Sequence, residues 1–271
     1  MNKPSFFYHP DISPTVAARR AGEMLVDLLV LYGGLLTRQR CAYTWPFLFK
    51  SNPAYRSAVY RLHKAGVVTR RSHKGGPRTL RVSEGKMTDP ALHPQKRWNA
   101  KWDGIWRVLV YDIPEKERTF RIGLCRYLHK LRLGCLQQSV WVTPRDIRPE
   151  YDDLLKALDI QYDSYLFDAR TVLGRKAQDI VGDAWNFREI QRRQSWFVEK
   201  CSSQVRRIQS QALSQREIEQ LAREEAFSYL SVMEKDPLLP RTLWPKGYRG
   251  ESAYEHHLAF VTTVKECLSR L

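Results

Sequence analysis

The sequence predicts an α+β protein of several domains, and three observations lead to this fold class. A basic N-terminal region combines helical patterns with two short β-rich runs, a central region alternates strand and helix patterns, and the C-terminal region is helical. The changes in periodicity place domains at 1–83, 102–169 and 170–271, with a polar linker over 84–101. With 271 residues the chain can form two or three separate cores.

The positive charge of the chain is concentrated near its N-terminus. The 56 residues from Leu28 to Ser83 contain eleven Lys or Arg and no Asp or Glu, and the formal net charge of the whole chain is +16. The natural partner of so concentrated a positive surface is a polyanion. The alternative is a solvated basic face that serves only solubility.

The basic segment has the element order of a DNA-binding domain. Apolar side chains recur at helical spacing over 16–32, and a second helix is expected between Thr37 and Trp45. A third begins after Ser51, with Pro53 in its first turn, and ends at Gly66. These helices predict a helix-turn-helix arrangement.

Two β-rich runs, Val67–Arg71 and Thr79–Val82, follow the third helix and predict a hairpin with a basic connection at 72–78. Three helices followed by a basic hairpin are typical of a winged helix-turn-helix domain. In such a domain the third helix enters the major groove, and the hairpin contacts the DNA backbone or the minor groove. The alternative is that the hairpin 67–82 is a generic surface hairpin and does not contact DNA.

This arrangement predicts which residues contact double-stranded DNA. Side chains on the third helix are expected to face base edges. Arg bonded to guanine is the commonest specific contact there. These side chains are Tyr55, Arg56, Ser57 and Arg61, and Ser51 begins the helix. Those expected mainly to neutralise phosphates are Arg38, Arg40, Lys64, Arg70, Arg71, Lys74 and Arg78.

The central region predicts a small domain of ferredoxin-like type, because strands and helices alternate over roughly 65 residues. The expected elements are a strand over Ile105–Tyr111, a helix over Glu115–Leu133, a strand over Leu136–Thr143, a helix over Arg148–Leu158 and a strand over Gln161–Asp168. In the C-terminal region, Ser214-Gln215-Arg216-Glu217 is a capping box that begins a helix, and the last helix covers Glu251–Leu268.

Several classes of protein are disfavoured by the sequence. Five cysteines without C-x-x-C spacing argue against zinc fingers and disulfide frameworks, and they fit a reducing cytoplasm. No apolar run approaches the roughly 20 residues of a membrane span. No phosphate-binding, hydrolase or zinc-protease motif occurs. The adjacent His256 and His257 would point about 100° apart on a helix and make a poor ligand pair, so we expect them at the surface or partly buried. We therefore expect no catalytic residue, no metal and no cofactor.

Three segments together resemble the PaaX-type transcriptional regulators, the phenylacetate-operon repressor family. They are the N-terminal winged helix, the run Trp102-Asp103-Gly104-Ile105-Trp106-Arg107 with Tyr111-Asp112-Ile113-Pro114, and the run Asp236-Pro237-Leu238-Leu239-Pro240 with Leu243-Trp244-Pro245 and Tyr248-Arg249-Gly250. Tyr248 stands where the family has Trp. The resemblance covers about nine-tenths of the chain.

The resemblance implies a sequence-specific repressor released from its operator by a small effector, typically an acyl-coenzyme A thioester. The central and helical domains would make a homodimer. A two-fold dimer implies a pseudo-palindromic operator with half-sites one or more helical turns apart.

The central domain is also similar to the small metal-dependent nuclease subunit of CRISPR adaptation, in which a strand-end Asp from each of two subunits faces a metal. Asp112 falls at that position. The alternative function is therefore a Mg²⁺-dependent nuclease or another nucleic-acid-processing protein. The ordinary role of such a residue is to cap the following turn and helix, and metal-ion hydrolysis usually requires more than one carboxylate.

Four tryptophans in the linker and the central domain allow two interpretations. Trp98, Trp102, Trp106 and Trp141 could line an effector pocket, or they could fill the core and the contacts between domains. Packing is the expected use, because Trp provides a large buried area at few positions.

Overall fold

The computed structural model of the chain describes residues 60, 63–64, 68–71, 79–82, 90–114, 118–152, 164–171 and 174–270. The chain divides into two compact units. Unit 1 comprises Met1–His93, Arg193–Met233 and Glu251–Leu271, and unit 2 comprises Pro94–Arg192 and Glu234–Gly250. The predicted helical domain over 170–271 is thus shared between the two units, since helix α8 (Phe187–Ser210) begins in unit 2 and ends in unit 1.

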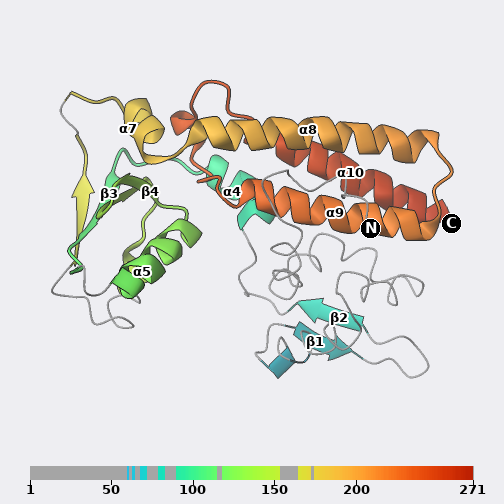
Figure 1. Cartoon of the computed structure of the whole chain (residues 1–271), viewed down its shortest axis with the longest axis horizontal. Coiled ribbons are helices and arrows are strands. Elements are labelled where there is room, and N and C mark those ends of the chain that lie inside the picture. The colour runs from blue at the N-terminus through green and yellow to red at the C-terminus, as the bar shows by residue number, and fades with distance from the viewer. Residues whose placement is uncertain are drawn as a thin grey trace. The chain divides into compact units, whose positions relative to one another are not determined.

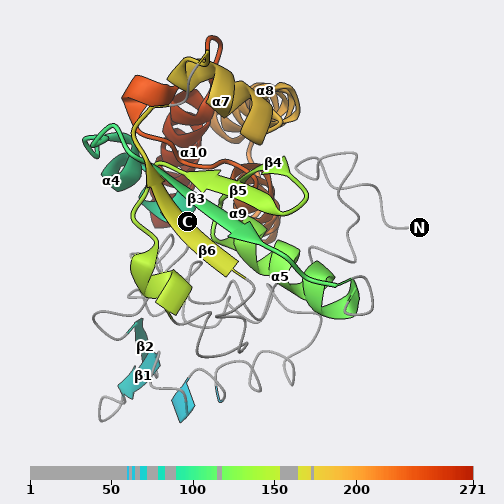
Figure 2. The same cartoon turned by 90° about the vertical axis from the view of Figure 1, so that its left-hand side faces the viewer.

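Unit 2 is built on a four-stranded antiparallel sheet with the strand order β4-β5-β3-β6 (Figure 2). The strands are β3 (Trp106–Tyr111), β4 (Gly134–Gln137), β5 (Val140–Thr143) and β6 (Ser164–Ala169). Helix α5 (Arg118–Lys130) connects β3 to β4, and residues 148–152 after β5 are helical. This succession agrees with the predicted ferredoxin-like type, whose element order is β-α-β-β-α-β.

The single strand predicted over Leu136–Thr143 is wrong. The segment instead contributes to a hairpin, in which β4 pairs with β5 through Gly134↔Val142 and Cys135↔Trp141, with an irregularity before Gln137. The chain reverses at Gln138 and Ser139. The pair lacks the Asn-Gly or Asp-Gly sequence that marks a two-residue hairpin most clearly, so the local sequence did not reveal it.

Alternate residues of the central strand β3 face opposite sides of the sheet and enter two different cores. On one side, Leu109 and Tyr111 pack with Leu124 and Leu128 of α5. On the other, Trp106 packs in a second cluster with side chains of β5 and of helix α7 (Ala177–Ala184), among them Val142, Ile180 and Val181. The sheet is therefore covered by helices on both faces.

Part of the predicted linker over 84–101 is folded. It contains a 3₁₀ turn, η3 (Pro90–Leu92), and the short helix α4 (Gln95–Trp98). Ala91 is buried in unit 1, where its carbonyl accepts a 2.7 Å hydrogen bond from the Tyr229 hydroxyl. Trp98 is buried in unit 2, with its ring edge-on to Trp244 at a centroid distance of 5.7 Å.

Three helices run side by side in unit 1: α8 from Arg193 onward, α9 (Gln215–Met233) and α10 (Gly250–Arg270) (Figure 1). The predicted capping box is confirmed, because the carboxylate of Glu217 accepts hydrogen bonds from the Ser214 backbone N–H at 2.9 Å and from its hydroxyl at 2.7 Å. The predicted last helix is also confirmed. Among the described residues, no helix has the length and apolar character needed to cross a membrane.

The helices of unit 1 enclose a polar pair at their centre. His257 Nδ1 lies 2.5 Å from Glu225 Oε1, and both side chains are fully buried. The His257 ring stacks on Tyr229 at a centroid distance of 4.0 Å. The expectation of a surface or partly buried position is wrong for His257, because the partner carboxylate that permits its burial comes from another helix. His256, by contrast, is half-buried.

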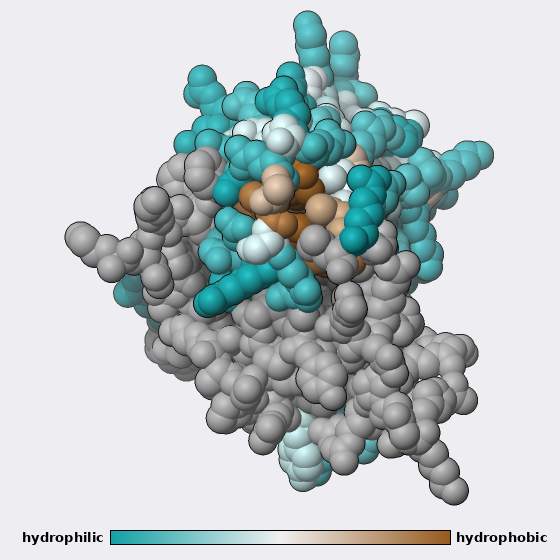
Figure 3. All heavy atoms as spheres, turned by 90° about the vertical axis from the view of Figure 1, so that its right-hand side faces the viewer, coloured by the Kyte–Doolittle hydropathy of each residue, from teal (hydrophilic) through white to brown (hydrophobic). Residues whose placement is uncertain are grey.

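Figure 3 shows one face of the molecule, on which the described side chains are mainly hydrophilic around one apolar area. The large apolar side chains that are exposed include Tyr165 and Phe167 on β6, and Ile122 and Tyr127 on α5.

Gly134 provides a test of the packing between β4 and α7. A Cβ atom at this position would lie 2.6 Å from the Cβ of Ala184 and 2.6 Å from Cε2 of Trp185. Gly134→Ala should therefore lower the free energy of unfolding by about 1–3 kcal/mol through overpacking, measured by denaturant unfolding. Gly123→Ala is the matched control, since nothing lies within 4 Å of its new Cβ on α5. That control should stabilise by about 0.5–1 kcal/mol, and an unchanged Gly134→Ala would contradict the close packing.

Candidate functional site

The predicted basic hairpin is present. Strands β1 (Val68–Arg71) and β2 (Thr79–Val82) pair antiparallel, from Val68↔Val82 to Arg71↔Thr79. Arg70 and Arg71 therefore lie on the strand that enters the connection 72–78. The connection itself, with Lys74 and Arg78, lies outside the described residues.

Only the end of the predicted third helix is described. Tyr60, His63 and Lys64 are helical and exposed, which agrees with the expected helix. Every predicted DNA contact stays a prediction, and nine of the residues concerned fall outside the described residues. They are Arg38, Arg40, Ser51, Tyr55, Arg56, Ser57, Arg61, Lys74 and Arg78.

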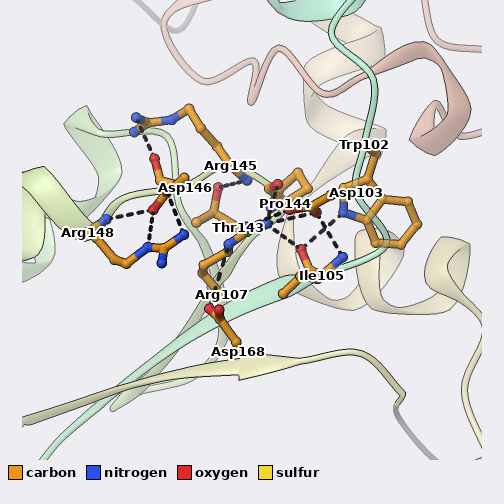
Figure 4. A network of polar contacts seen from close by, with 10 residues as sticks. All are labelled: Trp102, Asp103, Ile105, Arg107, Thr143, Pro144, Arg145, Asp146, Arg148 and Asp168. Carbon is orange, nitrogen blue, oxygen red and sulfur yellow. Dashed lines mark hydrogen bonds and ion pairs between the residues drawn. The ribbon is translucent and has the colours of Figure 1, made fainter.

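In unit 2, polar contacts gather around Arg107 on β3 (Figure 4). Its guanidinium donates to both carboxylate oxygens of Asp103, through Nη1 at 2.9 Å and Nη2 at 2.6 Å. Nη1 also reaches the carbonyl of Ile105 at 3.0 Å and that of Pro144 at 3.3 Å, and Nε lies 3.7 Å from Asp168 Oδ1. Arg107 is only 4% exposed, so these partners stabilise a buried charge.

The residues before Arg107 form a turn that holds its partner in place. Asp103 Oδ1 accepts a 3.0 Å hydrogen bond from the Ile105 N–H, Gly104 has a φ of +77°, and the Trp102 indole donates to the Ile105 carbonyl at 3.1 Å. The Trp102 ring then packs against Trp106 at 5.2 Å. The hydrogen bond from Arg107 is the main cause that lowers the pKa of Asp103, and the same bond raises the pKa of Arg107. The residues from Trp102 to Arg107 are thus held together by contacts within the fold.

The C-terminal motif likewise makes a buried polar anchor in unit 2. Asp236 is fully buried, and its carboxylate accepts hydrogen bonds from the Leu238 N–H and from the Tyr248 hydroxyl, both at 2.7 Å. Arg132, buried and with a φ of 67°, donates to the carbonyls of Glu234 and Asp236. Tyr248 thus holds the buried Asp236 through its hydroxyl.

Asp112 directly follows β3, as expected, and is exposed. Among the residues that the structure describes, no group of three or more His, Cys, Asp or Glu side chains could hold a metal ion. The capping role predicted for Asp112 stays a prediction, because residues 115–117 at the start of the next helix lie outside the described residues.

The four tryptophans do not surround one cavity. Trp106 and Trp141 belong to the cores on opposite faces of the sheet. Trp98 packs against Trp244, and Trp102 packs against Trp106. These contacts agree with packing rather than with a common effector pocket.

Comparison with known proteins identifies the central region. Residues 99–181 match the family model described as "PaaX protein central Cas2-like domain". This part of the chain is thus similar to the central domain of PaaX proteins. The residues around Arg107 and the sheet of unit 2 lie within this PaaX domain, whereas the hairpin β1–β2 precedes it.

The uncharacterized protein Rv0674 from Mycobacterium tuberculosis is 20% identical, with a TM-score of 0.48 over 93% of this chain and 97% of that one. No curated protein matches the chain.

The pairing of Asp103 with Arg107 was not predicted from the sequence, although both residues were noted as parts of a motif. An Asp and an Arg four residues apart around a glycine turn could have signalled it. The anchor of Arg132 could not have been found in this way, since its partners lie more than 100 residues away along the chain.

Asp103→Asn tests whether Arg107 depends on this carboxylate. It should lower the free energy of unfolding by about 1–2 kcal/mol, because a buried guanidinium loses its charged partner while the carboxylate itself is partly in solvent. Since the folded-state pKa of Asp103 is lowered, its contribution is present above its usual pKa of about 4 and is lost as pH falls through the folded-state value. Denaturant unfolding between pH 3 and 7 measures both effects.

The control for this prediction is Asp146→Asn. Asp146 also holds an arginine, Arg148, through two 2.9 Å contacts, but both side chains are largely exposed. A solvated pair should contribute less. Equal losses in the two variants would contradict a special role for the buried guanidinium.

Proposed function

We propose that the protein is a sequence-specific DNA-binding transcriptional repressor of PaaX type. The observation that carries the proposal is the acid-free basic segment 28–83 in a chain whose central domain is that of the PaaX family. The match supports a regulator-type role, and the basic segment supports duplex DNA as the partner.

The described parts of the N-terminal region agree with this proposal. A helix with exposed Lys64 is followed by a two-stranded hairpin that contains Arg70 and Arg71, which is the order of a winged helix-turn-helix domain. The third helix would read base edges with Arg56 and Arg61, and the hairpin connection would contact phosphates through Lys74 and Arg78.

The proposal extends to a homodimer on a pseudo-palindromic operator and to an effector that releases the DNA. A two-fold protein recognises two half-sites, so its operator reflects its symmetry. An acyl-coenzyme A thioester is the effector class proposed, and both extensions rest on the family resemblance.

The salt dependence of binding tests the basic surface. With 6–10 phosphate contacts, the affinity for duplex DNA should fall by about 10³–10⁵ between 50 and 200 mM salt. Arg56→Ala should remove the preference for operator over random sequence. Lys74→Ala should instead weaken all sequences alike and reduce the slope of log K against log salt by about one. Fluorescence anisotropy with both duplexes measures this, and an affinity that is flat with salt would contradict the proposed interface.

Asp112 distinguishes the repressor from the alternative, a Mg²⁺-dependent nuclease. In a repressor, Asp112→Asn should retain operator binding and lower stability by about 0.5–2 kcal/mol at most, the range for loss of a helix cap. Wild-type protein with Mg²⁺ or Mn²⁺ should leave plasmid, linear duplex and single-stranded DNA intact. Cleavage that disappears in the folded Asp112→Asn variant would favour the nuclease instead.

A further inference from the structure

A second acid-free stretch lies in the central domain. The 28 residues from Arg118 to Arg145 contain six Lys or Arg and no Asp or Glu. This stretch and the segment 28–83 together hold 17 of the 45 basic residues, so the rest of the chain has 28 basic against 29 acidic side chains. All of the net positive charge of the protein therefore resides in these two stretches.

Helix α5 presents much of this second charge to solvent. Arg118, Arg126 and Lys130 are exposed and differ by multiples of four residues, so they follow one face of the helix. Among the described residues, none of the three has an ion-pair partner. On its opposite face the same helix buries Leu124 and Leu128 against the sheet, which fixes the basic face outward.

Further cationic and apolar side chains lie near the basic face of α5. Lys235, from the C-terminal motif, lies close enough to His129 at the end of α5 to contribute, after burial, to a lowered His129 pKa. Ile122 and Tyr127 are 41% and 36% exposed beside the basic side chains. A helix face that combines cations, an exposed phenol and apolar groups resembles the contacts that proteins make with phosphates and sugars of DNA.

We infer that the α5 face is a second contact surface for the backbone of duplex DNA. This inference rests on the proposed function and adds a contact surface outside the winged helix. An exposed helix is convex and offers no enclosure for a small ligand. Its thirteen residues extend about 18 Å, which matches the axial length of about five phosphates of one strand. The surface strengthens binding without selecting a sequence, because phosphates carry no base information.

The test is a triple substitution in the full-length chain, Arg118→Gln, Arg126→Gln and Lys130→Gln. Gln is as good a helix former as the residues that it replaces, so the fold should persist, and thermal unfolding checks this. The matched control, Lys96→Gln, Arg188→Gln and Lys246→Gln, removes three exposed positive charges of the same unit outside both stretches. Binding to a random-sequence duplex is measured by anisotropy over a range of salt concentrations.

The α5 variant should reduce the slope of log K against log salt by about 2–3, at roughly 0.9 per phosphate contact, while the control keeps the wild-type slope. Equal reductions in both variants would show an effect of net charge alone and would overturn the inference, as would no reduction in either. Lys74→Ala separates the two proposals. If Lys74→Ala leaves the affinity and its salt dependence unchanged while the α5 variant has a smaller slope, the winged helix is not the DNA site and the α5 surface is retained as one. If the wild-type protein binds no duplex, both fail.

Discussion

Burial of the Arg107 guanidinium is the constraint on which the central domain depends. Arg107 lies on the central strand β3, and a buried cation is costly unless charged and polar groups pair with it. Both of its terminal nitrogens donate hydrogen bonds, whereas its buried Nε has none among the described residues and lies 3.7 Å from the Asp168 carboxylate. Asp103, in the turn before β3, accepts two hydrogen bonds from the guanidinium. The Pro144 carbonyl, which directly follows β5, accepts another, and the Asp168 carboxylate on β6 adds an ion pair. One side chain thus fixes the entry into β3 relative to its two neighbouring strands.

Buried polar contacts also hold the C-terminal motif in unit 2. Asp236 bonds Leu238 and Tyr248 within its own segment, and Arg132 binds the backbone of the same segment from the end of α5. Residues 234–250 are in this way joined to the sheet domain although they follow two long helices in the chain. Both runs of sequence in unit 2 that carry the family resemblance therefore contain contacts that hold this unit together.

The described residues of both motifs contribute mainly to packing and to buried polar contacts. The distinctive surface chemistry is instead positive charge, gathered in two stretches of sequence while the remainder is nearly neutral. Under the proposed function, such a distribution would direct a polyanion to these two stretches rather than to the whole surface.

The sequence by itself determined the α+β class, the strand β3, the hairpin β1–β2, the capping box of α9 and the last helix, because each follows from local periodicity or from capping chemistry. It also determined the concentration of charge in segment 28–83. The tertiary structure decided the reversal between β4 and β5, the burial of His257 and the sharing of the C-terminal region between two units. For His257 and for the C-terminal segment the deciding partner is distant in sequence: Glu225 beside His257, and Arg132 beside Asp236. The reversal between β4 and β5 lacks the Asn-Gly or Asp-Gly sequence of a hairpin, and the pairing of Cys135 with Trp141 defines it. Local patterns cannot encode such pairings, since their free energy arises only when separate segments meet and exclude water.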